Sequence, residues 1–157
     1  MQNKPFRTYN HNILLAVDSS DNSRRAVEYV GQMLGRAGGF HVTLLHVIPA
    51  PEDDYFPSDA ERESWLSGYR SKTNAVLQEY RDILITSGFS SDAVELFAPL
   101  RSCPSMAGCI LSEREKRASD TIVVGRQGLS RKEEFLFGSI SSKIVNHAKD
   151  CTVWVIS

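Results

Sequence analysis

Short apolar runs and longer amphipathic segments alternate along this chain of 157 residues. The runs are rich in aliphatic and β-branched residues, as buried strands are, and lie at about residues 12–18, 40–48, 93–98, 121–124 and 151–156. The segments between them repeat apolar residues at helical spacing, at about residues 20–37, 59–86, 104–117 and from 139 onward. Alternating strands and helices favour parallel crossovers with helices on both faces of one sheet. We therefore predict a single-domain, doubly wound α/β fold with a five-stranded parallel sheet.

Three glycines and a serine follow the fourth predicted strand at a distinctive spacing. Gly125 ends the strand, Gly128 follows it, and Gly138 with Ser139 comes directly before a helical segment. The amides at the start of a helix and its dipole favour phosphate. Glycine also lets the backbone approach a ligand without a side chain in the way. The spacing therefore predicts a phosphate site; in the alternative interpretation, the glycines serve tight turns alone.

The pattern Gly-x2-Gly-x9-Gly-Ser after this strand resembles the nucleotide-binding signature of the universal stress protein family, in its ATP-binding branch. Segments 12–20, 42–47 and 151–156 also resemble strands of that family, so the resemblance covers about residues 12–156. It implies an adenine-nucleotide α-hydrolase-like sheet with the strand order 3-2-1-4-5. It also implies bound ATP with Mg²⁺. We predict that residues 12–157 form this domain and that residues 1–11 are a short polar extension.

The resemblance further implies which residues contact the nucleotide. The backbone of Val47 would bind adenine, and Ala16 and Val17 would line the same wall. The other expected contacts are Val124, Gly125 and Gly128 to the ribose and α-phosphate, and Gly138, Ser139, Ile140 and Ser141 to the distal phosphates.

Two charged residues at strand ends leave alternatives open. Asp18 ends the first strand at the predicted switch point of the sheet, where ligands bind in such folds. Its carboxylate is predicted either to hold Mg²⁺ or polar groups of the nucleotide, or to cap the turn that follows. Arg126 stands where many relatives carry a small hydroxyl residue. Its guanidinium would either pair with a phosphate or lie in solvent.

Composition excludes several partners. Lys and Arg total 18 and Asp and Glu total 19, a formal net charge of −1. The chain therefore lacks the basic field that attracts nucleic acid or an anionic membrane. No apolar run approaches the roughly 20 residues that span a bilayer. The first residues also lack the apolar core of a signal peptide, so we predict a cytoplasmic protein.

The cysteines and histidines show no metal-ligand spacing. Cys103, Cys109 and Cys151 contain no Cys-x-x-Cys pair, and an odd count favours a reducing compartment over a disulfide framework. A redox role for Cys103 and Cys109 is the minor alternative, and Cys151 is expected to be a small buried apolar residue. His46 lies in an otherwise apolar run, so we expect a hydrogen-bonded core histidine.

The resemblance to this family implies a regulatory, ATP-binding stress protein with at most slow ATP hydrolysis. Its apolar closing strand, residues 151–156, is expected to pair with a second copy, as the resemblance also implies. One alternative is a dimerisation module without nucleotide. The other is an adenylating enzyme, whose Ser-Gly-Gly-x-Asp-Ser loop is replaced here by residues 18–23 without glycine. The P-loop and dinucleotide-binding glycine patterns are absent from the sequence.

Overall fold

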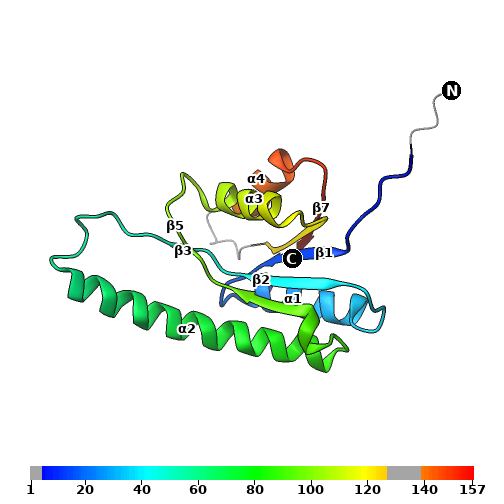
Figure 1. Cartoon of the computed structure of the whole chain (residues 1–157), viewed down its shortest axis with the longest axis horizontal. Coiled ribbons are helices and arrows are strands. Elements are labelled where there is room, and N and C mark those ends of the chain that lie inside the picture. The colour runs from blue at the N-terminus through cyan, green and yellow to red at the C-terminus, as the bar shows by residue number, and fades with distance from the viewer. Residues whose placement is uncertain (1–4, 127–138) are drawn as a thin grey trace.

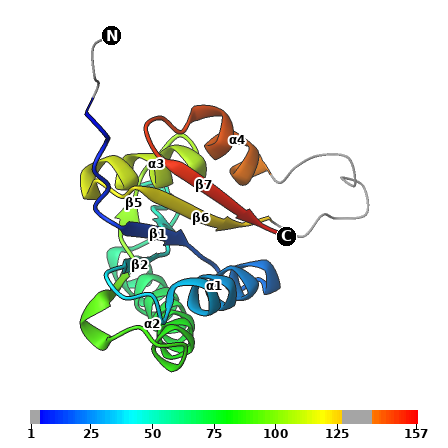
Figure 2. The ribbon, with the colours of Figure 1, turned by 90° about the vertical axis from the view of Figure 1, so that its right-hand side faces the viewer.

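The computed structural model describes residues 5–126 and 139–157 and contains a parallel sheet of five strands at its centre (Figures 1 and 2). The strands of this sheet are β1 (Asn12–Ala16), β2 (His41–Leu45), β4 (Val94–Phe97), β6 (Thr121–Gly125) and β7 (Thr152–Ile156). Their order is β4-β2-β1-β6-β7, and all neighbours pair in parallel. Numbered within the sheet, this is the order 3-2-1-4-5, so the predicted fold is confirmed.

Two helices cover each face of the sheet (Figure 2). On one face lie α1 (Asp21–Leu34) and α2 (Asp59–Thr86), and on the other lie α3 (Met106–Arg117) and α4 (Ser139–His147). Successive residues of β1 pack into different clusters, Leu14 with α3 and α4 and Leu15 with α1 and α2, and both are 0% exposed. The apolar runs are continuous because both faces are buried. In the part of the chain that the structure describes, no helix is both long and apolar enough to cross a membrane.

Serine side chains set the starts of three helices. Ser20, Ser58 and Ser105 accept hydrogen bonds from the amides of Ser23, Glu61 and Gly108, which satisfies groups that a helix start leaves unpaired. The range 59–86 predicted for α2 is confirmed.

The end of α1 differs from its prediction. The helix ends at Leu34 instead of continuing to the Gly38–Gly39 pair. Gly35 follows it at a close approach to the end of α2, where an added Cβ would collide with the Ser87 carbonyl. Met33, near the end of α1, is 56% exposed.

Two short strands beyond β2 and β4 were not predicted. Strands β3 (Ile48–Pro49) and β5 (Leu100–Arg101) pair in parallel as a separate small sheet. The strand predicted at 40–48 is therefore divided into β2 and β3, whereas the strand predicted at 93–98 agrees with β4 to within one residue at each end. Ile48 pairs with Leu100 in the same register in which Leu45 pairs with Phe97, so β3 and β5 continue the pairing of β2 and β4 after a short gap. Across this gap the amide of His46 donates a hydrogen bond to the Phe97 carbonyl, and the amide of Ile48 donates one to the Pro99 carbonyl.

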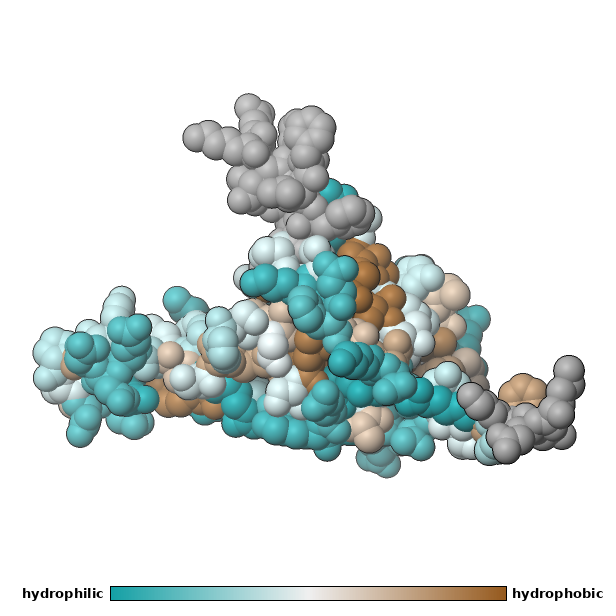
Figure 3. Space-filling model, turned by 90° about the horizontal axis from the view of Figure 1, so that it is seen from above, coloured by the Kyte–Doolittle hydropathy of each residue, from teal (hydrophilic) through white to brown (hydrophobic). Residues whose placement is uncertain are grey.

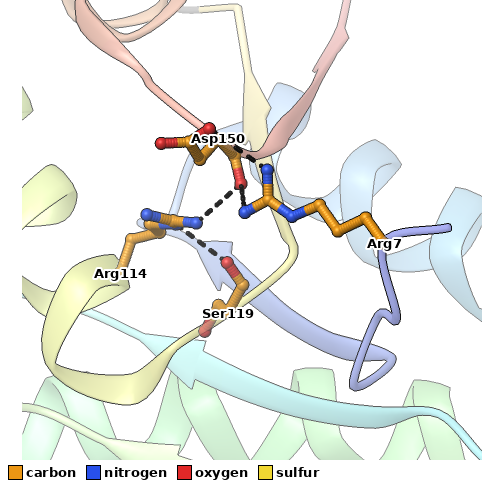
Figure 4. Close-up of polar contacts among 4 residues, drawn as sticks. All are labelled: Arg7, Arg114, Ser119 and Asp150. Atoms are coloured by element: carbon orange, nitrogen blue, oxygen red, sulfur yellow. Dashed lines mark hydrogen bonds and ion pairs between the residues drawn. The ribbon is translucent and has the colours of Figure 1, made fainter. Parts of the chain in front are cut away.

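The amino-terminal segment is attached at the amino edge of the sheet, beside the start of β7 (Figure 4). Arg7 donates to Oδ1 of Asp150 at 3.1 Å and to its carbonyl at 3.0 Å. Arg114 donates to the same carbonyl and to the carbonyl of Ser119, each at 2.9 Å. Because Arg7 and Asp150 are well exposed, this pair adds little stability. These contacts lie away from the carboxyl edge, at the other end of the strands, where a ligand is expected.

Candidate functional site

A cavity of about 270 Å³ lies at the carboxyl ends of β1 and β6, where the strand order reverses. Its walls are mainly apolar and include a few polar groups, the mixture typical of small-molecule sites. The described residues that line it are Ala16, Val17, Asp18, Ser20, Ser23, Leu45, His46, Val47, Pro49, Tyr69, Met106, Ile110, Val124, Gly125 and Ile140.

Most of the predicted site residues lie on this cavity. Those that line it are Ala16, Val17, Asp18, Val47, Val124, Gly125 and Ile140. Ser139 and Ser141 flank Ile140 in the first turn of α4; Ser139 is exposed, whereas Ser141 is buried. Arg126 directly follows β6. Gly128 and Gly138 lie outside the described residues, so the predictions about them stay predictions.

Hydrogen bonds from the start of α1 and from α2 hold Asp18 at the edge of the sheet. Its Oδ1 accepts hydrogen bonds from the amide of Ser20 at 2.8 Å and from the hydroxyl of Ser23 at 2.9 Å. Its carbonyl accepts a hydrogen bond from the Tyr80 hydroxyl of α2 at 2.6 Å. The predicted turn-capping role is thus present. Among the described residues none donates to Oδ2, so capping and ligand binding are compatible.

The surroundings of Asp18 keep a negative charge in the cavity. Burial acts to raise the pKa of Asp18, but hydrogen bonds from Ser20 and Ser23 and the nearby His46 outweigh it, and the net pKa lies below its usual value. Burial and, next, the charge of Asp18 raise the pKa of Tyr80 to about 12. At neutral pH Asp18 is therefore ionised, while Tyr80 keeps the proton that it donates.

His46 and Tyr69 join the strand edge to α2. Nδ1 of His46 lies 2.8 Å from the carbonyl oxygen of Val17, and Nε2 lies 3.1 Å from the Tyr69 hydroxyl. Because a carbonyl only accepts, Nδ1 must carry a proton and donate it to Val17. The prediction of a hydrogen-bonded histidine is confirmed. His46 also lines the cavity, which the sequence did not predict.

A second cavity of about 270 Å³ adjoins the first on the side of α2. The two share Val17, Asp18, His46 and Tyr69, and Lys72 of α2 lines the second one. The histidine and tyrosine therefore form part of the wall where the two cavities meet, and this edge of the sheet offers more room than either cavity alone.

Gly125 is required by packing within the protein. A Cβ on this residue would lie 2.7 Å from the carbonyl carbon and oxygen of Asn22 and 2.9 Å from the amide nitrogen of Ser23. The first turn of α1 therefore sits directly against the end of β6. Close packing of backbone against backbone thus accounts for this glycine, a reason other than the tight turn that the alternative interpretation named. Its contact with a ribose stays a prediction.

The backbone of Arg126 fixes the exit of β6. Its amide donates to the Ile156 carbonyl of β7 at 2.6 Å, and its carbonyl accepts from the side-chain amide of Asn22. Strands β6 and β7 and helix α1 thus meet at this point. Both predicted roles of the Arg126 side chain stay predictions.

The model of the universal stress protein family matches residues 10–97 and 104–157. The chain belongs to this family. A comparison with curated protein sequences gives no match.

Three solved structures of other universal stress proteins share the fold of this chain. One, in complex with cAMP, has 21% identity and a TM-score of 0.70, with 96% of this chain and 99% of that chain covered. UspA from Lactobacillus plantarum has 22% identity and a TM-score of 0.70, with 96% of this chain and 100% of that chain covered. A third, from Archaeoglobus fulgidus in complex with dAMP, has 18% identity and a TM-score of 0.60, with 95% of this chain and 98% of that chain covered.

Several wall residues of this universal stress protein were missed by sequence reasoning. Tyr69 comes from α2, and Met106 and Ile110 come from the first two turns of α3. Their helical spacing predicts an inward face, but spacing cannot distinguish a core contact from a cavity wall. Only the packing of α2 and α3 against the strand ends makes that distinction.

The carboxylate of Asp18 fits one ligand position of a nucleotide-bound Mg²⁺ ion. Within residues 5–126 and 139–157, no group of three or more His, Cys, Asp or Glu side chains converges as a metal site. A closed protein cage is not what Mg²⁺ needs beside phosphates, because it commonly takes one or two carboxylates and completes its shell with phosphate oxygens and water. Asp18 lines this cavity, and its Oδ2 is suited to be such a carboxylate ligand because the hydrogen bonds from Ser20 and Ser23 go to Oδ1.

Proposed function

We propose that this protein binds ATP, with Mg²⁺, in the cavity at the carboxyl edge and acts as a regulatory nucleotide-binding dimer with at most slow ATP hydrolysis. The main support is that residues far apart in the sequence converge on one cavity. Residues from the ends of β1 and β6, from the segment after β2 and from the first turn of α4 line one cavity. The two relatives whose structures contain cAMP and dAMP support an adenine nucleotide as the ligand.

The chemistry of the walls suits the two ends of such a ligand. Val47, Ile110 and Val124 are each under 5% exposed and offer an apolar slot for a planar base. Ser139, at the start of α4, is exposed, and Ile140 beside it lines the cavity. The amides of this turn and the helix dipole would attract the phosphates.

Calorimetric titration tests the proposal directly. ATP, AMP, cAMP and GTP are titrated separately into freshly purified protein with Mg²⁺, and any ligand released on denaturation is identified by mass spectrometry. We expect saturable binding of ATP that is tighter than binding of GTP. Undetectable ATP binding at millimolar concentration, with no nucleotide released from the purified protein, would overturn the proposal.

Replacing Asp18 by Asn isolates the role of its charge. An asparagine side chain keeps an oxygen that can accept from Ser20 and Ser23, so the turn should persist while the carboxylate is lost. We expect ATP affinity with Mg²⁺ to fall about tenfold, about 1.4 kcal/mol, because one charged contact is lost. In excess chelator the two proteins should bind ATP nearly equally, as measured by calorimetry.

Asp18→Ala serves as the comparison, because alanine removes both the charge and the acceptor. It should weaken ATP binding in chelator as well, since the turn before α1 loses its cap. If Asp18→Asn weakened binding equally with and without Mg²⁺, the metal role of Asp18 would be wrong and capping alone would explain its position.

The edge strand β7 is the proposed contact between two copies. In the described sheet β7 pairs with β6 alone. Tyr29 of α1 contacts Trp154 of β7 edge-on at 6.0 Å. Exposed apolar residues on β7 and the helices next to it are Tyr29 (43%), Met33 (56%), Val145 (54%) and Val155 (36%). Seen from the side of α3 and α4, the surface is largely hydrophilic, with apolar residues gathered near its middle (Figure 3).

Val155→Lys should disrupt this dimer. A lysine on an edge strand opposes pairing with another strand, and two copies would bring like charges together. We expect light scattering at micromolar concentration to give twice the chain mass for the wild type and one chain mass for the variant. Tyr55→Lys, at a residue 71% exposed on the distant loop before α2, should stay dimeric. A monomeric wild type, unchanged by ATP and Mg²⁺, would contradict the proposed dimer.

A further inference from the structure

A disulfide joins Cys103 and Cys109 across the start of α3, with their Cα atoms 5.9 Å apart. Sequence reasoning favoured free thiols, because the pair lacks a Cys-x-x-Cys spacing. In the structure Cys151 alone of the three cysteines is free, and it is partly buried. Between the bonded residues lies Ser105, the N-cap of α3, which accepts from the Gly108 amide. The helix start brings the two sulfurs together, which spacing alone did not indicate.

The disulfide lies beside two residues of α3 that line the candidate nucleotide cavity. Met106 and Ile110 line that cavity, and Ile110 directly follows Cys109. Both cysteines belong to the apolar cluster that packs under α3 and α4. Any change in how this helix start is held therefore acts on two wall residues of the cavity.

An ion pair holds the same connection independently of the disulfide. Nε of Arg101 in β5 lies 2.9 Å from Oε1 of Glu113 in α3, and the Glu113 side chain is 4% exposed. Opening the disulfide would leave β5 attached to α3 through this ion pair, whose carboxylate is buried. The effect should therefore be confined to residues 102–106 and the first turn of α3, and the fold should persist.

We propose that Cys103 and Cys109 form a thiol–disulfide exchange site that takes a low-molecular-weight thiol as its reductant and the corresponding disulfide as its oxidant. Cys103 is partly exposed and Cys109 is 6% exposed, so Sγ of Cys103 is the atom that a small thiolate can reach. Its attack breaks the bond to Cys109, whose sulfur leaves with the electron pair and then takes up a proton. Cys109 lies near the start of α3, where the helix dipole stabilises the departing thiolate.

A second thiol completes the exchange. It attacks the sulfur of the small thiol in the mixed disulfide, which releases the small disulfide and leaves Cys103 as a thiol. The net reaction converts one protein disulfide and two small thiols into two protein thiols and one small disulfide. In the reverse direction the small disulfide oxidises the protein. In a reducing compartment such a bond is typically transient and regulatory.

The consequence for ATP rests on the proposed function, whereas the exchange itself does not. The disulfide restricts the segment before α3 and so pre-forms one wall of the cavity. Once reduced, that segment gains freedom that binding must remove again. We expect the reduced protein to bind ATP about fivefold more weakly, at the low end of typical coupling between two sites.

Thiol mapping tests the exchange site without any nucleotide. The protein is equilibrated with oxidised or with reduced glutathione, unfolded in denaturant, alkylated with iodoacetamide and digested for mass spectrometry. The protein from oxidised glutathione should be alkylated at Cys151 alone, and the protein from reduced glutathione at all three cysteines. Hydrogen exchange of residues 102–111 should be faster after reduction. Labelling of all three cysteines after oxidation, or equal exchange in the two forms, would overturn the proposal.

ATP titration of the two forms tests the coupling. The wild type and Cys151→Ser should both bind about fivefold more tightly when oxidised. Cys103→Ser/Cys109→Ser, first confirmed folded by circular dichroism, should bind like the reduced wild type in either condition. Equal affinity of the oxidised and reduced wild type would overturn the coupling. If neither form binds ATP, the proposed nucleotide function fails, and thiol mapping with hydrogen exchange still decides the exchange site.

Discussion

Ile140→Glu is expected to weaken ATP binding by about thirtyfold, because it places a negative charge on the cavity wall beside the expected phosphates. Two unit charges about 8 Å apart at an effective dielectric constant near 20 repel by about 2 kcal/mol, which corresponds to that factor. Ile140 is only partly buried and lies in the first turn of α4, where glutamate suits the helix dipole. The fold should therefore tolerate the change, and calorimetric titration with Mg²⁺ measures the loss.

Asn146→Glu is the matched control for this prediction. It adds the same charge to the same helix at an exposed residue that does not line the cavity. Its ATP affinity should stay within about twofold of the wild type, because exposed charges at a distance are screened by salt. Equal affinities of Ile140→Glu and the wild type would place the phosphates away from α4 and contradict the proposed orientation of the nucleotide.

Gly125→Ala is expected to lower the free energy of unfolding by about 2 kcal/mol, the usual cost of forcing extra volume into a packed site. The new Cβ would lie 2.7 Å from the Asn22 backbone, closer than atoms in proteins pack, so α1 must move away from β6. Because backbone cannot rotate aside as a side chain can, the strain is not easily relieved. Urea unfolding followed by circular dichroism, without nucleotide, measures the effect.

Gly68→Ala provides the comparison within α2. A Cβ on Gly68 meets nothing within 4 Å, and alanine is the better helix former. This variant should be as stable as the wild type or more stable, by up to about 1 kcal/mol. Unchanged stability of Gly125→Ala in the absence of nucleotide would mean that the glycine serves the ligand alone, and that the contact with α1 adjusts at no cost.

These two predictions separate packing from ligand contact at the same cavity. Gly125 borders the cavity and also admits the first turn of α1, whereas Ile140 borders it from a helix that need not move. A loss of stability is therefore expected at Gly125 and a loss of affinity at Ile140. If both variants lost affinity with unchanged stability, the glycine would have to be assigned to the nucleotide as well.

The sequence by itself determined the layers of this fold. Apolar runs that alternate with amphipathic segments indicated a parallel sheet covered on both faces. The strand order followed from the resemblance to universal stress proteins. Asp18 and Gly125, far apart in the chain, could be expected at one edge because parallel strands end there together.

Tertiary structure alone decided which side chains make the cavity and why. Tyr69 and Met106 reach it because α2 and α3 pack against the strand ends, and no local pattern distinguishes such a wall from ordinary core. The contact that requires Gly125 joins residues about a hundred positions apart, and the Cys103–Cys109 bond depends on where α3 begins. Periodicity reports which face of an element is buried, because burial repeats along the chain. The identity of the neighbour on that face is set by long-range packing, which has no local period.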